Sequence, residues 1–194
     1  DWKGSGGYDY GAARAKYDKD ATDAGATGKR TYSRKSDPDM KLVNPKGKVI
    51  TSDSVDPVII AVDVTGSMAS WPGEIFDRLP LLYQTLGKYR PGLDLAFAAI
   101  GDATCDHYPL QVTEFAHDIK SLEARLKGLG CEGGGGGSIQ ESYELFGYYA
   151  LKKCETPKAT TPFLIMYGDE AFYENVDPKQ VKHFVGDTLQ DPLP

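Results

Sequence analysis

The chain has 194 residues, of which 40% are hydrophobic and 26% are charged, and its formal net charge is −6. This composition suits one ordinary soluble domain, and no apolar run approaches the roughly 18 residues of a membrane span, so no membrane partner is expected. The three cysteines and three histidines have no zinc-site spacing, and an odd number of cysteines argues against a disulfide framework. We therefore expect a reducing, cytoplasmic location.

The N-terminal quarter of the chain differs from the remainder in charge and apolar content. Residues 1–50 hold 11 Lys and Arg against 7 Asp, a balance of +4, whereas the remainder holds 11 against 21 Asp and Glu, a balance of −10. Residues 1–38 have almost no Leu, Ile, Val or Phe, so we interpret them as a flexible basic arm. Its tyrosines suit stacking on single-stranded nucleic acid: Tyr8, Tyr10, Tyr17 and Tyr32. The acidic main domain opposes that partner, and a solvated tail is the simpler interpretation.

The next segment leads into the main domain. Two short apolar runs flank the turn-forming tetrapeptide Asn44-Pro45-Lys46-Gly47, so residues 39–55 are predicted to form a short hairpin or linker. The domain, residues 56–194, begins with the β-branched run 57–62, which is typical of a strand buried on both faces. Apolar residues at helical spacing follow over residues 72–88.

The remaining elements alternate between strand and helix. A buried strand is predicted at 95–100, with a hairpin neighbour at 110–113. Helices are predicted at 118–129 and 138–153, another buried strand at 163–167, and helical structure again at 178–185. This alternation predicts a Rossmann-like three-layer α/β/α sandwich with a mostly parallel central sheet.

Three predicted strands end at or just before an acidic residue: Asp63, Asp102 and Asp169. Because ligands bind outside the carboxyl ends of parallel strands, we expect these residues to face one crevice. Clustered carboxylates repel one another unless a cation lies between them. Thr65 and Ser67 add hydroxyl groups at alternate positions after Asp63, and such oxygens suit a hard cation such as Mg²⁺.

These motifs and their order along the chain resemble those of the von Willebrand factor A (VWA) domain. The metal-ion-dependent adhesion site (MIDAS) of that family reads DxSxS, matched here by Asp63, Thr65 and Ser67, with Thr in place of the first Ser. With Met68 the string reads DxTGSM, which is similar to intracellular members, including those attached to alpha-type kinases. The likeness continues through residues 97–102, the glycine run 133–137, and residues 138–142 and 165–169.

The resemblance implies a VWA-like fold from residue 57 to about residue 190 and a bound Mg²⁺, with Mn²⁺ or Ca²⁺ as alternatives. It implies Asp63, Thr65, Ser67 and Asp169 as metal-site residues. A family Thr before the third helix is a further ligand; the glycine run stands there in this chain, and Ser138 is the substitute candidate ahead of Thr104. Other residues are expected behind the ligands or at the rim: Asp102, Thr104, Asp106 and Gly137.

In function, the resemblance implies a protein-interaction module and no enzyme. An Asp or Glu side chain of a protein partner would complete the coordination of the cation. The family also has further strands and a closing helix after the position of Asp169, whereas about 25 residues follow it here. We therefore expect a C-terminally incomplete sheet whose edge a second chain could cover.

The alternative is a haloacid dehalogenase-like phosphohydrolase that uses Mg²⁺. The segment Asp63-Val64-Thr65-Gly66-Ser67 is similar to the DxTGT loop of that family, which would make Asp63 the nucleophile. Most members carry a second acid where Thr65 stands, and the sequence offers no convincing phosphate-binding Lys. The glycine-rich stretch also has no role in that scheme, so binding is favoured over catalysis.

Overall fold

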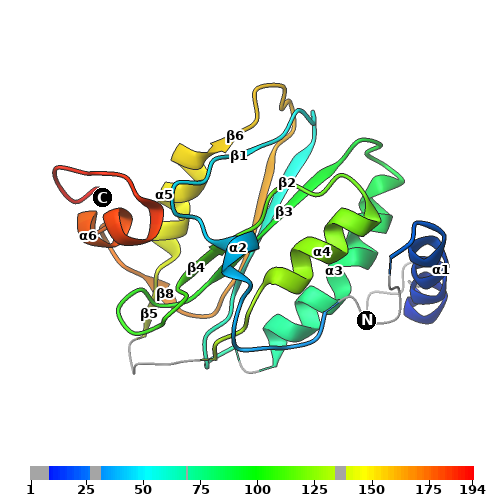
Figure 1. The fold of residues 1–194 in the computed structure, drawn as a ribbon, viewed down its shortest axis with the longest axis horizontal. Helices are drawn as coiled ribbons and strands as arrows, with labels where there is room; N and C mark the ends of the chain where they lie inside the picture. The colour runs from blue at the N-terminus through cyan, green and yellow to red at the C-terminus, as the bar shows by residue number, and fades with distance from the viewer. Residues whose placement is uncertain (1–8, 27–31, 69, 134–138) are drawn as a thin grey trace, which may run out of the picture.

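The structure, a computed structural model, describes residues 9–26, 32–68, 70–133 and 139–194 (Figure 1). The helices are α1 (Tyr10–Asp23), α2 (Met40–Val43), α3 (Trp71–Gly87), α4 (Ile119–Gly128), α5 (Tyr143–Lys153) and α6 (Pro178–Gln180), the last continued by a π-helical turn, η1 (Val181–Val185). The strands are β1 (Ile50–Thr51), β2 (Pro57–Asp63), β3 (Asp94–Ile100), β4 (Leu110–Val112), β5 (Gln140–Glu141), β6 (Cys154–Glu155), β7 (Phe163–Tyr167) and β8 (Ala171–Phe172).

The central sheet has the strand order β4-β3-β2-β7. Strand β2 runs parallel to both β3 and β7, whereas β4 pairs antiparallel with β3, so the predicted mixed but mainly parallel sheet is confirmed. The register aligns Asp63 with Ile100 and Val62 with Tyr167. The segments that follow these three strands therefore leave the sheet at the same edge.

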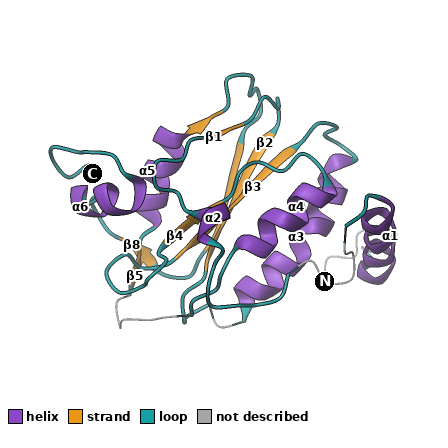
Figure 2. Ribbon diagram, in the orientation of Figure 1, coloured by secondary structure: helices purple, strands orange, loops and turns teal. Residues whose placement is uncertain are grey.

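Helices cover both faces of this sheet. Successive strand residues direct their side chains to opposite faces, and both faces are apolar here, so each packs against helices. The face under α3 and α4 holds Val58, Ile60, Val62, Leu95, Phe97 and Ala99, packed with Phe76, Leu79, Leu122 and Leu126. The opposite face holds Ala61, Ala96, Ala98 and Ile100, packed with Leu145, Phe146 and Tyr149 of α5 and with Val181 and Val185 of η1. Figure 2 shows the strands in orange between the α3–α4 pair and α5.

The N-terminal segment differs from the predicted flexible arm, because residues 10–23 form α1. Asp9 caps this helix by accepting a hydrogen bond of 3.0 Å from the Ala12 N–H. Tyr17 and Ala21 are buried against Leu81 of α3. The few apolar residues of α1 are enough to hold it in place, because α1 packs on the outer side of α3 and contributes nothing to the central core.

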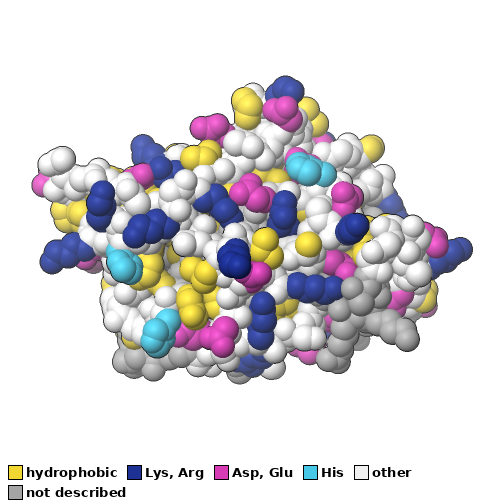
Figure 3. Space-filling model, viewed as in Figure 1, with side chains coloured by type: hydrophobic (Ala, Val, Ile, Leu, Met, Phe, Trp, Pro, Cys, Tyr) yellow, Lys and Arg dark blue, Asp and Glu magenta, His cyan; other side chains and the backbone are white. Residues whose placement is uncertain are grey.

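The tyrosines proposed for nucleic-acid stacking have structural contacts where their side chains are described. Tyr17 is fully buried, and Tyr32 lies in the core, with its ring centroid 5.0 Å from that of Phe76 in an edge-to-face arrangement. Tyr8 lies outside the described residues. Figure 3 shows basic and acidic side chains interspersed over one face of the molecule, without segregation of the basic ones on that face.

Residues 39–55 contain the predicted turn but no hairpin. The Lys46 N–H donates to the Asn44 side chain over 3.0 Å, as expected for this turn. The run before the turn forms α2, and the run after it forms β1, which pairs in parallel with β6. The short runs thus pack against distant parts of the chain, and these non-local contacts override their hairpin pattern.

Strand β7 forms one edge of the central sheet. In the described part of the chain it pairs only with β2, and four of its side chains are exposed: Phe163, Leu164, Met166 and Tyr167. Beyond β7, the chain returns through β8, which pairs in parallel with β5 in a separate two-stranded sheet. The helices in the described ranges are all too short or too polar to cross a membrane.

Candidate functional site

The residues after three parallel strands come together at one edge of the sheet. Asp63 ends β2, Asp102 follows β3 by two residues, and Asp169 follows β7 by two residues. The common direction of these strands places all three acids at their carboxyl ends, as the sequence predicted. The conformations of the loops after the strands determine which of these acids lie in contact.

A continuous chain of hydrogen bonds links β2 to the loop after β7. The Asp63 Oδ1 atom accepts from the Thr65 N–H at 2.8 Å and from the Thr65 hydroxyl at 2.6 Å. The Thr65 and Ser67 hydroxyl oxygens lie 3.2 Å apart, and the Ser67 hydroxyl donates to Asp169 Oδ1 over 3.0 Å. Four of the predicted site residues therefore form one cluster of oxygen atoms.

This cluster has a buried floor and an exposed lip. Asp63 and Thr65 are buried, with exposed fractions of 0% and 2%, whereas Ser67 and Asp169 are exposed. Strand β2 runs through the middle of the sheet and so buries Asp63, while the outward turn of the loop carries Ser67 to the surface. A ligand would approach from the side of Ser67 and Asp169.

Tyr143, which the sequence did not single out as a site residue, contacts the same cluster. It is the first residue of α5, and its hydroxyl donates a hydrogen bond to Asp63 Oδ2. Burial, followed by the contact with the Asp63 carboxylate, raises the pKa of Tyr143 well above its usual value. Both carboxylate oxygens of Asp63 thus accept hydrogen bonds from protein groups.

Glu141 is the second residue that sequence reasoning missed. It ends β5, is 5% exposed, and has the Thr65 side chain near enough to influence its pKa. Burial, and then the charges of Asp63 and Asp102, raise its pKa to about 8. Among the described residues, its Oε2 atom has no hydrogen-bond partner. An acid just before a helix, after a glycine run, is the only sequence signal that marked it.

Asp102 is held by its own loop. Its Oδ1 atom accepts from the Thr104 N–H at 2.8 Å and from the Tyr173 hydroxyl at 3.1 Å, and its Oδ2 atom accepts from the Thr104 hydroxyl at 2.7 Å. Asp106 accepts from the Asp102 N–H at 2.8 Å, and burial raises the pKa of its carboxyl. Asp102, Thr104 and Asp106 therefore bind one another beside the cluster, and Ser138 and Gly137 lie outside the described residues.

An open hollow of about 420 Å³ adjoins the exposed lip of the cluster. Its lining combines the two polar residues of the lip with apolar and aromatic neighbours: Ser67, Met68, Trp71, Ile75, Met166, Tyr167, Gly168 and Asp169. Trp71 is 63% exposed, which is unusual for so large an apolar side chain. The lip therefore offers charge and apolar surface side by side.

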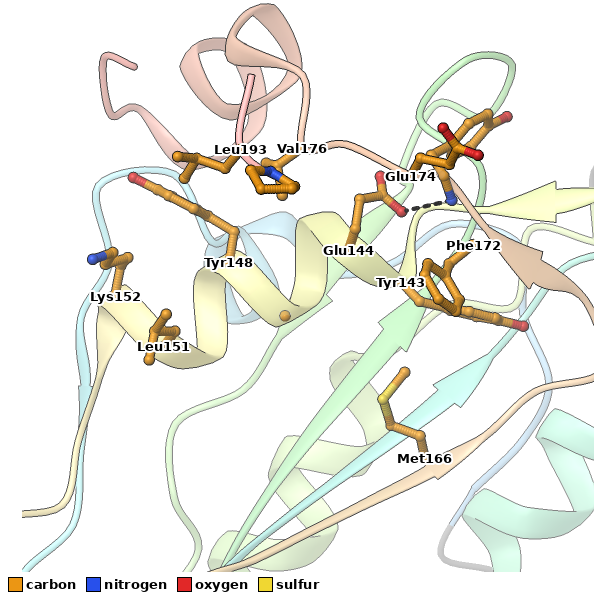
Figure 4. A pocket seen from close by; sticks show the side chains of 13 residues that line it. Tyr143, Glu144, Tyr148, Leu151, Lys152, Met166, Phe172, Glu174, Val176 and Leu193 are labelled. Atoms are coloured by element: carbon orange, nitrogen blue, oxygen red, sulfur yellow. Dashed lines mark hydrogen bonds between the residues drawn. The ribbon is translucent and has the colours of Figure 1, made fainter. Parts of the chain in front are cut away.

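A second hollow, of about 610 Å³, lies between α5 and the C-terminal segment. Figure 4 shows Tyr148 and Leu151 of α5 on one side of it, Val176 and Leu193 on another, and Met166 of β7 below α5. Glu144 borders this hollow, and its Oε2 atom accepts from the Tyr173 N–H over 3.4 Å, drawn as the dashed line. This second hollow is mainly apolar, and Tyr143, which lines it, also contacts Asp63 of the oxygen cluster.

The cluster consists of carboxylate and hydroxyl oxygens, which are the kinds of ligand that hard cations prefer. In the described ranges, no group of three or more His, Cys, Asp or Glu residues is arranged to hold a metal ion. Any cation here would depend on the Thr65 and Ser67 hydroxyls as well as on carboxylates. Comparison of the chain with protein-family models, with curated proteins and with solved structures found no match.

Proposed function

We propose that this chain is a metal-dependent protein-interaction module with a VWA-like three-layer α/β/α fold and a MIDAS-type site. Asp63, Thr65 and Ser67 would hold a divalent cation, Mg²⁺ or alternatively Mn²⁺ or Ca²⁺, with Asp169 linked through Ser67. The observation that carries the proposal is the hydrogen-bonded chain that runs from Asp63 through both hydroxyls to Asp169. Helices on both faces of a mainly parallel sheet support the proposed layered fold.

The charges around the cluster fit a cation. Asp63, Asp102 and Glu141 are all buried. Among the ion pairs formed between described residues, none includes any of these three carboxyl groups. Burying carboxylates close together without a compensating charge is costly, and a bound cation removes that cost. Carboxylate and hydroxyl oxygens are also the ligands that Mg²⁺ prefers.

The surroundings of the lip support a protein as the partner. When bound, a divalent cation supplies a coordination position that an Asp or Glu carboxylate of the partner fills. The adjoining hollow is open, and the exposed Trp71 indole beside it offers apolar contact of the kind that dominates protein interfaces. A partner with an acidic residue flanked by apolar residues would match both features.

Binding is better supported than phosphoryl transfer to Asp63. Oδ1 of Asp63 accepts two hydrogen bonds from Thr65 and Oδ2 accepts one from Tyr143, which lowers the nucleophilicity of the carboxylate, whereas a cation can use the remaining lone pair of Oδ2. Asp63 is also fully buried. The hydroxyl at Thr65 occupies the place of the second acid that most members of the phosphohydrolase family carry.

Isothermal titration of the metal-free chain with Mg²⁺ and with Mn²⁺ tests the metal site. We expect one cation per chain, with binding reduced at least tenfold by Ser67→Ala and lost in Asp63→Asn. Ser67 is exposed, so its substitution removes a ligand with little effect on folding. Asp53→Asn is the matched control, because Asp53 precedes β2 and its exposed carboxylate forms only a surface ion pair, over 3.0 Å with Lys158, which contributes little to stability. Equal binding by wild type, Ser67→Ala and Asp63→Asn would overturn the proposal.

The partner is tested with a library of short peptides that each contain one Asp or Glu, beside the same peptides with Asn or Gln. We expect capture of a subset in Mg²⁺, loss of that capture in EDTA, and loss in the amide peptides. Capture that is unaffected by EDTA would show a different mode of recognition.

A further inference from the structure

Glu141 is anchored beside the oxygen cluster from both directions along the chain. Strand β5, which it ends, pairs with β8, and the Ala171 N–H donates to the Ile139 carbonyl over 3.2 Å. On its other side, the Ser142 N–H donates to the Gly101 carbonyl over 3.2 Å. The backbone around Glu141 is therefore tied both to the loop after β7 and to the end of β3.

The side chain of Glu141 reaches the floor of the cluster. It is 5% exposed, and Thr65, Asp63 and Asp102 are near enough to influence its pKa. In the described part of the chain its Oε2 atom is buried without a hydrogen-bond partner. Nearly every buried polar atom in a folded protein is satisfied by protein groups, water or a ligand, and the oxygen cluster nearby favours a cation as the partner of this atom.

We infer that Glu141 is a direct ligand of the cation proposed for this site, in the position for which the sequence suggested Ser138 or Thr104. This inference rests on the proposed metal site. The cation would then be held by two carboxylates, Asp63 and Glu141, and two hydroxyls, Thr65 and Ser67. Those two carboxylates balance the charge of a divalent ion, so the isolated chain binds the cation without help from a partner.

Glu144 provides a matched comparison three residues further along the chain. Its carboxyl also has one buried oxygen without a hydrogen-bond partner among the described residues, Oε1. Its other oxygen accepts from the Tyr173 N–H, and its side chain borders the hollow beside α5. The substitution Glu144→Gln therefore removes a similar half-buried carboxyl group that forms no hydrogen bond with Asp63, Thr65, Ser67 or Asp169 among the described residues.

The decisive experiment is titration of the metal-free chain with Mn²⁺, followed by calorimetry and by the loss of the free-ion electron paramagnetic resonance signal. We expect one site in wild type, at least tenfold weaker binding in Glu141→Gln, and unchanged binding in Glu144→Gln. Glu141→Asp retains the charge with a shorter side chain and should bind with intermediate affinity. Thermal unfolding of each variant in EDTA verifies that it is folded.

The outcomes separate this inference from the proposal beneath it. If wild type and Glu141→Gln bind Mn²⁺ equally, while Ser67→Ala binds weakly, the metal site stands and Glu141 is no ligand. If wild type binds no Mn²⁺, the proposed metal site fails and this inference fails with it. If Glu144→Gln weakens binding as much as Glu141→Gln does, the effect comes from general charge, and the assignment of Glu141 as a ligand is overturned.

Discussion

The Tyr143 hydroxyl donates a hydrogen bond to Asp63 Oδ2, and so joins the first turn of α5 to the end of β2. This is the carboxylate oxygen that Thr65 leaves free, because Thr65 contacts only Oδ1. A phenol and a metal ion that approach Asp63 compete for the same oxygen. The Tyr143 hydroxyl would therefore weaken the binding of a cation to Asp63, the most buried acid of the proposed site.

We predict that Tyr143→Phe strengthens Mn²⁺ binding by about fivefold. The variant removes a hydrogen bond to a charged group, and a contribution of about 1 kcal/mol corresponds to that factor. Isothermal titration measures the change. Tyr148→Phe, on the same helix, is the control, because its hydroxyl donates to Asp187 over 3.0 Å, away from the cluster. Weaker Mn²⁺ binding by Tyr143→Phe would mean that the phenol positions Asp63 for the cation.

We predict that Gly168→Ala destabilises the fold by about 1 to 3 kcal/mol. A methyl group at this position would overlap the Tyr143 hydroxyl and ring, so the ring would have to leave Asp63. Urea unfolding in EDTA measures the loss. The double variant Gly168→Ala with Tyr143→Phe should lose less than the sum of the two single changes, because one clash is shared. Gly147→Ala is the control: it meets no atom within 4 Å and lies inside α5, where alanine should stabilise by about 0.5 to 1 kcal/mol.

We predict that the free energy of unfolding of wild type falls between about pH 4.5 and pH 7, and that this fall is absent in Glu144→Gln. Burial, the largest cause, raises the pKa of Glu144 from 4.5 to about 7. In that window the folded chain retains a proton that the unfolded chain has released, so the free energy of unfolding falls as pH rises and is level above the folded pKa.

At pH 8 the variant should therefore be more stable than wild type by about 1 to 3 kcal/mol, since each pH unit of difference is worth about 1.4 kcal/mol. Urea unfolding in EDTA, repeated from about pH 4 to about pH 8, measures the free energy of unfolding of wild type and of Glu144→Gln on both sides of this titration window. Parallel profiles for the two proteins would show that Glu144 ionises alike in the folded and unfolded chains.

We predict that incubation with acetyl phosphate and Mg²⁺ leaves the chain unmodified. Hydrogen bonds from Thr65 and Tyr143 engage both oxygens of Asp63 and lower the nucleophilicity of its carboxylate. Intact mass measurement checks for an acid-stable, base-labile phosphoryl adduct. An adduct that Asp63→Asn abolishes would replace the binding proposal with a phosphohydrolase mechanism.

We predict that Tyr17→Ala releases α1 from the domain. Tyr17 is fully buried against α3 and α4, with its hydroxyl 3.3 Å from Glu123 Oε1, and loss of a buried aromatic ring typically costs about 3 to 5 kcal/mol. Hydrogen exchange should show loss of amide protection over α1 with little change in β2 and β3. The control Tyr89→Ala alters a side chain that is 78% exposed and should leave α1 protected. Unchanged protection of α1 in Tyr17→Ala would mean that other contacts hold this helix.

Much of the fold could be predicted because the signals are local. The apolar run of β2, the amphipathic spacing of α3 and α4, and the strand at Phe163–Tyr167 each read directly from the chain. Asp63, Thr65 and Ser67 are close in sequence, so their contacts follow from one loop. Asp169 could be added because parallel strands end at a common edge.

Other features depend on contacts between distant residues, for which the local sequence carries no pattern. Two-residue strands such as β5 and β8 have no periodicity, and their pairing decides where Glu141 lies. The start of α5 at Tyr143, where residues 138–153 were predicted to be helical, brings the phenol to Asp63. Likewise α1 is a weakly apolar segment that becomes ordered by packing on α3. Local residue types thus gave the strands, the helices and the DxTGS loop, whereas packing across the chain selected Tyr143 and Glu141 as the partners of that loop.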